Sequence, residues 1–134
     1  MQRLNDEVRM PNQARSPKPE RKYDLPDRTA KFGESVIRFT RGVQRDPIVD
    51  PLLSQLVRSS SSIGANYMEA DAAESKRDFR HKISLAKKEA QETMHWLRMM
   101  ATASTTTHDE CQTLWKEAHE LTLIFGAILK RAKK

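Results

Sequence analysis

The chain has 134 residues, a length that suits one domain, with a formal net charge of +6 and a single cysteine. One cysteine excludes an intrachain disulfide and a thiolate metal cluster, and no apolar run is long enough to span a bilayer. These features favour a cytoplasmic protein without a membrane partner. The basic excess is compatible with polyanionic partners or with an ordinary solvated surface.

Residues 1–22 are polar, contain several prolines and show no period, which predicts a disordered basic tail. Met10 is an alternative start of the chain. The remaining residues, 23–134, are expected to form the folded domain. All prolines lie in the first 51 residues, so nothing after Pro51 forces a helix to stop.

The first helix is predicted to begin at Leu25-Pro26-Asp27, with Asp27 as its N-cap. Asp46-Pro47 should end it, because the residue before a proline avoids the helical region. Between these points an apolar face recurs at helical spacing: Phe32, Gly33, Val36, Ile37, Thr40 and Val43.

The next segment, SQLVRSSSSIGANYMEA at residues 54–70, is rich in small residues. Apolar residues recur at three- and four-residue steps from Leu52 to Met68, which indicates a helix and argues against a linker. A phosphate-binding loop would need a glycine-rich turn and a lysine, which are missing. The small side chains should therefore let a neighbouring helix approach closely: Ser59, Ser60, Gly64 and Ala65.

The third helix has Ser75 as its predicted N-cap and the clearest apolar stripe in the chain. This core stripe consists of Phe79, Ile83, Ala86, Ala90, Thr93, Leu97 and Met100. A capping box at Thr107-His-Asp-Glu110 should begin the fourth helix, whose stripe runs from Cys111 to Ala132. Four amphipathic helices with mostly short connections predict an all-α protein, an antiparallel up-down four-helix bundle behind a disordered N-terminal tail.

A further line of half-apolar residues runs beside the core stripe of the third helix. This second stripe consists of Leu85, Glu89, Glu92, Trp96, Met99 and Ala103. Aromatic residues and Met are enriched at subunit interfaces, which would make Leu85, Trp96 and Met99 interface residues of a homo-oligomer. The alternative is that the stripe only widens the core face.

Basic residues point outward from the same helix. We call them the basic row: Arg77, Arg80, Lys87, Lys88 and Arg98. Such a row could follow the phosphates of a nucleic acid, or it could be a solvated helix face. No aromatic residue interleaves with these bases to stack on nucleobases.

No set of residues predicts catalysis, a metal site or a cofactor. Glu92-Thr-Met-His95 has the Glu-x-x-His spacing of di-iron bundles, but it occurs once and His95 points away from the core stripe. A structural polar set is more promising on the second helix: Arg58, Asn66 and Glu69. A partly buried Arg58 would need paired charge, for which Glu89 and Glu92 are candidates within or between subunits. Exposed intrahelical pairs are the alternative.

These residues belong to a longer pattern, Ser54-Gln55-Leu56-x-Arg58-Ser59 … Ser62-Ile63-x-Ala65-Asn66-x-x-Glu69 and Phe79 … Ala86-x-x-Glu89-x-x-Glu92 … Leu97. Together with Tyr23-Asp24-Leu25 and Lys31-Phe32, it resembles the bacterial 23S rRNA intervening-sequence protein family over about residues 22–134. Many members continue Asn-Ile-Ala-Glu-Gly, whereas this chain has Asn66-Tyr67-Met68-Glu69-Ala70, which suggests a distinct branch.

The resemblance implies a helical bundle that forms a ring-like homopentamer and has no enzymatic activity. A related group, the accessory proteins of diversity-generating reverse transcriptases, binds nucleic acid and the polymerase through a basic pentamer surface. We therefore expect a non-enzymatic homo-oligomer that binds RNA or DNA through the basic row. The alternative is a scaffold for a protein partner, such as a polymerase, with no direct nucleic-acid contact.

Overall fold

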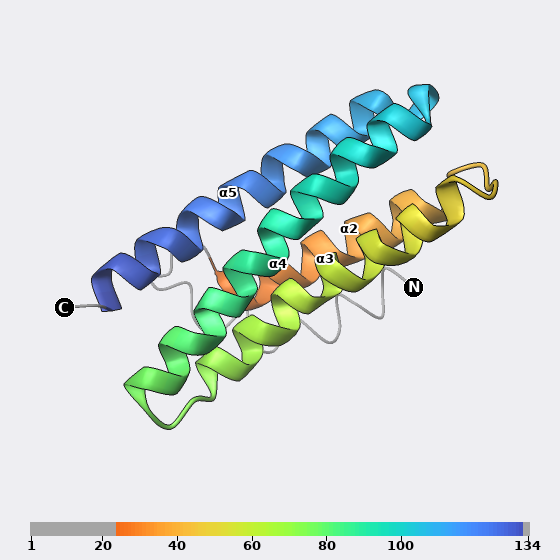
Figure 1. Ribbon diagram of the computed structural model, residues 1–134. Helices are drawn as coiled ribbons and strands as arrows, with labels where there is room; N and C mark the ends of the chain where they lie inside the picture. The colour runs from red at the N-terminus through yellow and green to blue at the C-terminus, as the bar shows by residue number, and fades with distance from the viewer. Residues whose placement is uncertain (1–23, 133–134) are drawn as a thin grey trace.

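The computed structural model describes residues 24–132, in which four α-helices follow one another. They are α2 (Leu25–Arg41), α3 (Val49–Asp71), α4 (Lys76–Ala103) and α5 (His108–Ala132), with a short 3-10 turn η1 (Thr105–Thr107) before α5. The helices run antiparallel in chain order (Figure 1). The predicted all-α bundle is confirmed, whereas the predicted tail and Met10 lie outside the described residues.

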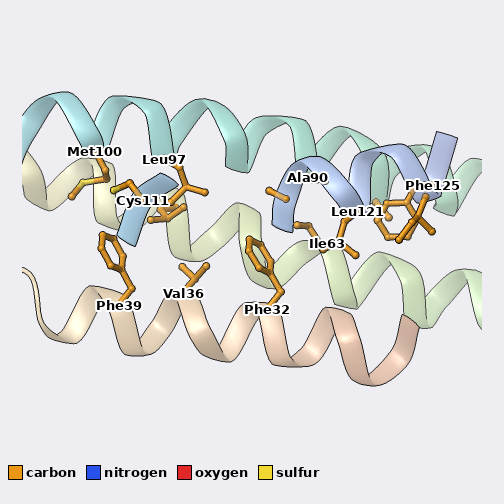
Figure 2. Close-up of a cluster of buried hydrophobic side chains, with 14 of the residues drawn as sticks. Phe32, Val36, Phe39, Ile63, Ala90, Leu97, Met100, Cys111, Leu121 and Phe125 are labelled. Carbon is orange, nitrogen blue, oxygen red and sulfur yellow. The ribbon is translucent and has the colours of Figure 1, made fainter. Parts of the chain in front are cut away.

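The core lies where the apolar stripes meet. Phe32 and Val36 of α2 pack with Ile63 of α3, Leu97 of α4 and Phe125 of α5 in one buried cluster (Figure 2). The core stripe of α4 is confirmed, since all its members are buried except the half-buried first one, Phe79. On α2 the prediction was wrong for Ile37, which is 41% exposed, while Phe39 is buried in its place.

The first helix begins within the predicted segment, but its predicted N-cap and its predicted end were wrong. The helix begins at Leu25, so Asp27 lies inside the first turn, where its charge faces the positive helix end. At the other end α2 stops at Arg41, before Gly42. Asp46 instead lies in the turn before α3, where its Oδ1 accepts hydrogen bonds from the backbone amides of Ile48 at 2.8 Å and of Val49, the first residue of α3, at 2.7 Å.

The later helix starts give one confirmation and one correction. Ser75 caps α4 as predicted, accepting a 3.0 Å hydrogen bond from the Asp78 amide. Thr107 does not form the predicted capping box among residues 24–132, because it lies in η1 and its hydroxyl donates to the Ser104 carbonyl at 2.9 Å. The 3-10 turn therefore leads directly into α5.

The small residues of α3 serve two neighbours. Ser59 faces α4, where the Thr93 hydroxyl donates to its Oγ at 2.9 Å in a buried contact. Gly64 faces α2, and a Cβ added there would lie 3.3 Å from Thr29 Oγ1. Close helix approach is therefore confirmed, except that Ala65 is exposed and takes no part in it.

Candidate functional site

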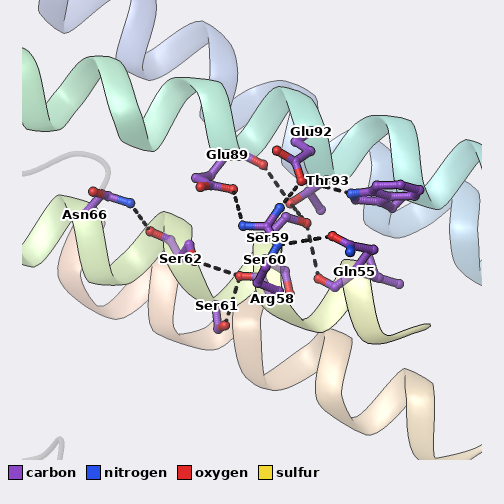
Figure 3. A network of polar contacts seen from close by, with 12 residues as sticks. Gln55, Arg58, Ser59, Ser60, Ser61, Ser62, Asn66, Glu89, Glu92 and Thr93 are labelled. Carbon is purple, nitrogen blue, oxygen red and sulfur yellow. Dashed lines mark hydrogen bonds and ion pairs between the residues drawn. The ribbon is translucent and has the colours of Figure 1, made fainter. Parts of the chain in front are cut away.

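A polar network joins α3 to α4 on one side of the bundle (Figure 3). The Arg58 guanidinium lies 3.4 Å from Glu89 Oε1, forms an ion pair with Glu92, and donates to Gln55 Oε1 at 3.2 Å. The Trp96 indole N–H donates to Glu92 Oε2 at 3.1 Å. The network thus holds Arg58 between two carboxylates of the same chain. This agrees with the prediction that Glu89 and Glu92 pair with Arg58 within one subunit.

The other two members of the predicted polar set lie apart from Arg58. The Asn66 side-chain amide donates to the Ser62 carbonyl one turn earlier, at 2.9 Å. Glu69 instead accepts a 2.6 Å bond from Lys82 of α4. This hydrogen bond, together with the negative charge of Glu69, raises the pKa of Lys82 above its ordinary value. The polar set is therefore three separate contacts along α3.

The second stripe lies on the side of α4 that carries the network. All six of its residues are half-buried. Trp96 and Ala103 pack against the core, so the stripe does widen the core face. Leu85 and Met99 keep part of their apolar surface in solvent, which leaves this edge of α4 available to another chain.

The basic row occupies the outward face of α4. Arg77, Lys88 and Arg98 are exposed, whereas Arg80 and Lys87 are half-buried. Among residues 24–132, no member of the row has a carboxylate oxygen within 4 Å. Arg80 Nε is buried and has no hydrogen-bond partner within that same range.

Lys87 marks where the basic row meets α5. A Cβ built on Gly126 would lie 3.9 Å from both Cε and Nζ of Lys87, so the lysine crosses the next helix at its glycine. The row therefore reaches α5 at Lys87 rather than standing alone on one helix.

The described residues contain no group of three His, Cys, Asp or Glu side chains that could hold a metal ion. Glu92 is engaged by Arg58 and Trp96, and the exposed His95 packs against the Trp96 ring at 4.9 Å between centroids. Cys111 is buried, and burial raises the pKa of its thiol. No helix in the described part is long and apolar enough to cross a membrane.

No sequence pattern indicated the contact between α2 and α5. Arg28 donates from Nε and Nη2 to the two carboxylate oxygens of Glu117, at 2.7 and 2.9 Å. The ion pair lines a groove of about 510 Å³, bordered by Asp24, Asp27, Arg28, Lys31, Phe32, Ser35, Thr113, Leu114 and Glu117. The partners are 89 residues apart, so no local pattern could have revealed the pair.

A family model described as 23S rRNA-intervening sequence protein matches residues 21–127. The chain belongs to this family. A solved structure from the S23 ribosomal protein family of Bacteroides thetaiotaomicron, itself of unknown function, is similar with 26% identity and a TM-score of 0.70. The match covers 79% of this chain and 98% of that one. No curated protein matches. In this intervening-sequence protein, the spaced polar motif corresponds to the Arg58 network between α3 and α4.

Proposed function

We propose that this intervening-sequence protein is a non-enzymatic homo-oligomer, a pentamer by family resemblance, that binds RNA or DNA through the basic row. The observation that carries the proposal is the lack of acidic partners for the row within residues 24–132, while Arg58 and Lys82 at the α3–α4 interface are both paired. An unpaired cation can neutralise a phosphate without first breaking an internal ion pair.

The dimensions of the row suit a nucleic-acid strand. From Arg77 to Arg98 it extends about 32 Å at 1.5 Å per helical residue. The outward positions between them, Ser84, Gln91 and His95, carry no acid that would repel phosphate. One strand of a duplex places a phosphate about every 3.4 Å along the axis, so the row is long enough to contact several.

The second stripe supports the assembly part of the proposal. It lies toward α3, whereas the basic row lies on the outward side of α4 and reaches α5 at Lys87, so a second copy could cover Leu85 and Met99 without burying the row. A ring would then present several copies of the row to one polyanion. Linked copies raise the effective concentration of each further contact, so modest individual affinities would suffice.

A salt titration with a charge-matched control tests the proposal. We expect a labelled RNA or DNA 20-mer to bind at low salt, with log affinity falling linearly as log salt concentration rises. Lys87→Glu with Lys88→Glu should weaken binding at least tenfold. Arg38→Glu with Arg41→Glu makes the same change in net charge on exposed positions of α2 and should have a much smaller effect.

Two results would count against the proposal. No affinity for RNA or DNA at low salt would remove nucleic-acid binding altogether. Equal losses from the α4 and α2 variants would show that only total charge matters and that the row is not the binding surface.

A further inference from the structure

A stacked aromatic pair lies on α5. The rings of Trp115 and His119 have centroids 5.1 Å apart and planes inclined by 25°. The two residues are one helical turn apart, so they share a face of the helix. Trp115 packs on the core, but both residues are only half-buried, so part of the stacked surface faces solvent.

Two contacts between α4 and α5 fix where this pair lies. Lys87 crosses α5 at Gly126, and the Thr122 hydroxyl donates to Met94 Sδ at 3.6 Å. Because the helices are antiparallel, moving one turn further along α4 corresponds to moving one turn back along α5. The Trp115–His119 pair therefore lies beside the later part of α4, the part that ends the basic row at Arg98.

The α5 surface between the aromatic pair and Lys87 is also open. Leu123, which is 55% exposed, follows His119 by one turn and precedes Gly126. On the surface where α4 meets α5, the α4 side thus carries the basic row, and the α5 side carries the aromatic pair and Leu123. The sequence analysis found no aromatic residue interleaved with the basic row on α4, whereas the Trp115–His119 pair belongs to the neighbouring helix α5.

We propose that the surface where α4 meets α5 binds single-stranded nucleic acid, with an unpaired base stacking on the Trp115–His119 pair while the phosphates follow the basic row. The inference rests on the proposed function and adds the substrate class. Aromatic side chains beside a basic groove suit a single strand, because its bases are free to leave their own stack. A duplex keeps its bases paired and offers only phosphates and groove edges to such a surface.

Binding of matched single-stranded and duplex 20-mers tests the inference. Removal of one stacking side chain weakens single-strand binding by about 1–3 kcal/mol, or roughly 5- to 150-fold. We therefore expect His119→Ala to weaken binding of a single-stranded oligothymidine at least fivefold and to leave duplex binding nearly unchanged. His108→Ala, an exposed histidine at the start of α5, is the matched control and should change neither.

Tryptophan fluorescence gives an independent readout. The chain has two tryptophans, so Trp96→Phe leaves Trp115 as the only one. Oligothymidine should quench its emission in proportion to binding, because a stacked base lies against the aromatic pair. The particle mass of this variant is compared with that of the wild type first, since Trp96 lies on the second stripe.

The outcomes separate the two proposals. If His119→Ala binds single strands like the wild type, or if Trp115 emission does not change on saturation, the stacking inference is wrong. Nucleic-acid binding by the basic row would still stand if the Lys87→Glu and Lys88→Glu variant loses affinity for both strand types. If no oligonucleotide binds, both proposals fail.

Discussion

Replacement of Gly64 by Ala sets two effects of similar size against each other. Ala favours a helix over Gly by about 1 kcal/mol, which alone would stabilise α3. However, the new Cβ would lie 3.3 Å from Thr29 Oγ1 and 3.5 Å from Thr29 Cβ. Thr29 is buried, and its hydroxyl donates to the Leu25 carbonyl at 2.7 Å, so it cannot easily move. Overpacking of this kind costs about 1–3 kcal/mol.

We therefore expect Gly64→Ala to lower the free energy of unfolding by about 0–2 kcal/mol, the difference between the two effects. Gly126→Ala is the matched control, because its Cβ would meet only Lys87 at an ordinary 3.9 Å. That change should stabilise the protein by about 1 kcal/mol. Urea unfolding at a fixed protein concentration, followed by circular dichroism, measures both.

A double-mutant cycle with Thr29→Ala isolates the clash. In that background the hydroxyl is gone, so Gly64→Ala should become stabilising by about 0.5–1 kcal/mol. If Gly64→Ala stabilises the wild-type chain as much as Gly126→Ala does, the close approach of α2 to α3 does not constrain this position and the reasoning is refuted.

Three further predictions concern assembly, reactivity and pH. Trp96→Asp should convert the particle to a monomer of 15.4 kDa, because a charge would lie in the proposed interface. Light scattering measures the mass, and an unchanged mass would contradict the interface. Cys111 should react with a thiol reagent at pH 8 only after urea unfolding, because its burial raises the thiol pKa; rapid labelling of the folded protein would be the contrary result. Lys82→Met should lower the free energy of unfolding at neutral pH, because the ion pair with Glu69 is lost. Glu69 raises the pKa of Lys82 in the folded protein, so the difference in stability between variant and wild type should close as the pH rises above 10.5 and Lys82 loses its proton. A difference that does not change with pH would argue against the pair.

The helices themselves could be predicted because their apolar periods are local. The α4 stripe from Ile83 to Met100 needs only the three- and four-residue steps of the chain, and every member is buried. Helix ends were less predictable, because an Asp can cap a helix, lie in its first turn or follow its end. Only the folded chain shows which of these roles Asp27 and Asp46 each have. Asp46 accepts hydrogen bonds from the amides that lead into α3 rather than ending α2.

The candidate site was predictable to the extent that it lies on one helix. The basic row follows from the helical spacing of α4. Glu89 and Glu92 were predicted as partners of Arg58 because a partly buried charge needs pairing, and they do pair with it, although Arg58 itself is exposed. The Trp115–His119 platform did not follow, because the part of α4 that it lies beside depends on how α4 aligns with α5. Sequence spacing within one helix carries no information about that alignment.

The hydrogen bond between Thr93 and Ser59 limits how far α4 can slide along α3. A shift of one turn, about 5.4 Å, would move the two hydroxyls out of reach in a region that water does not enter. Surface residues of α4 could then be substituted in evolution while the position of this helix along α3 stayed the same. Together with the apolar core, this buried hydrogen bond thus contributes to where the charges on the outside of α4 are presented.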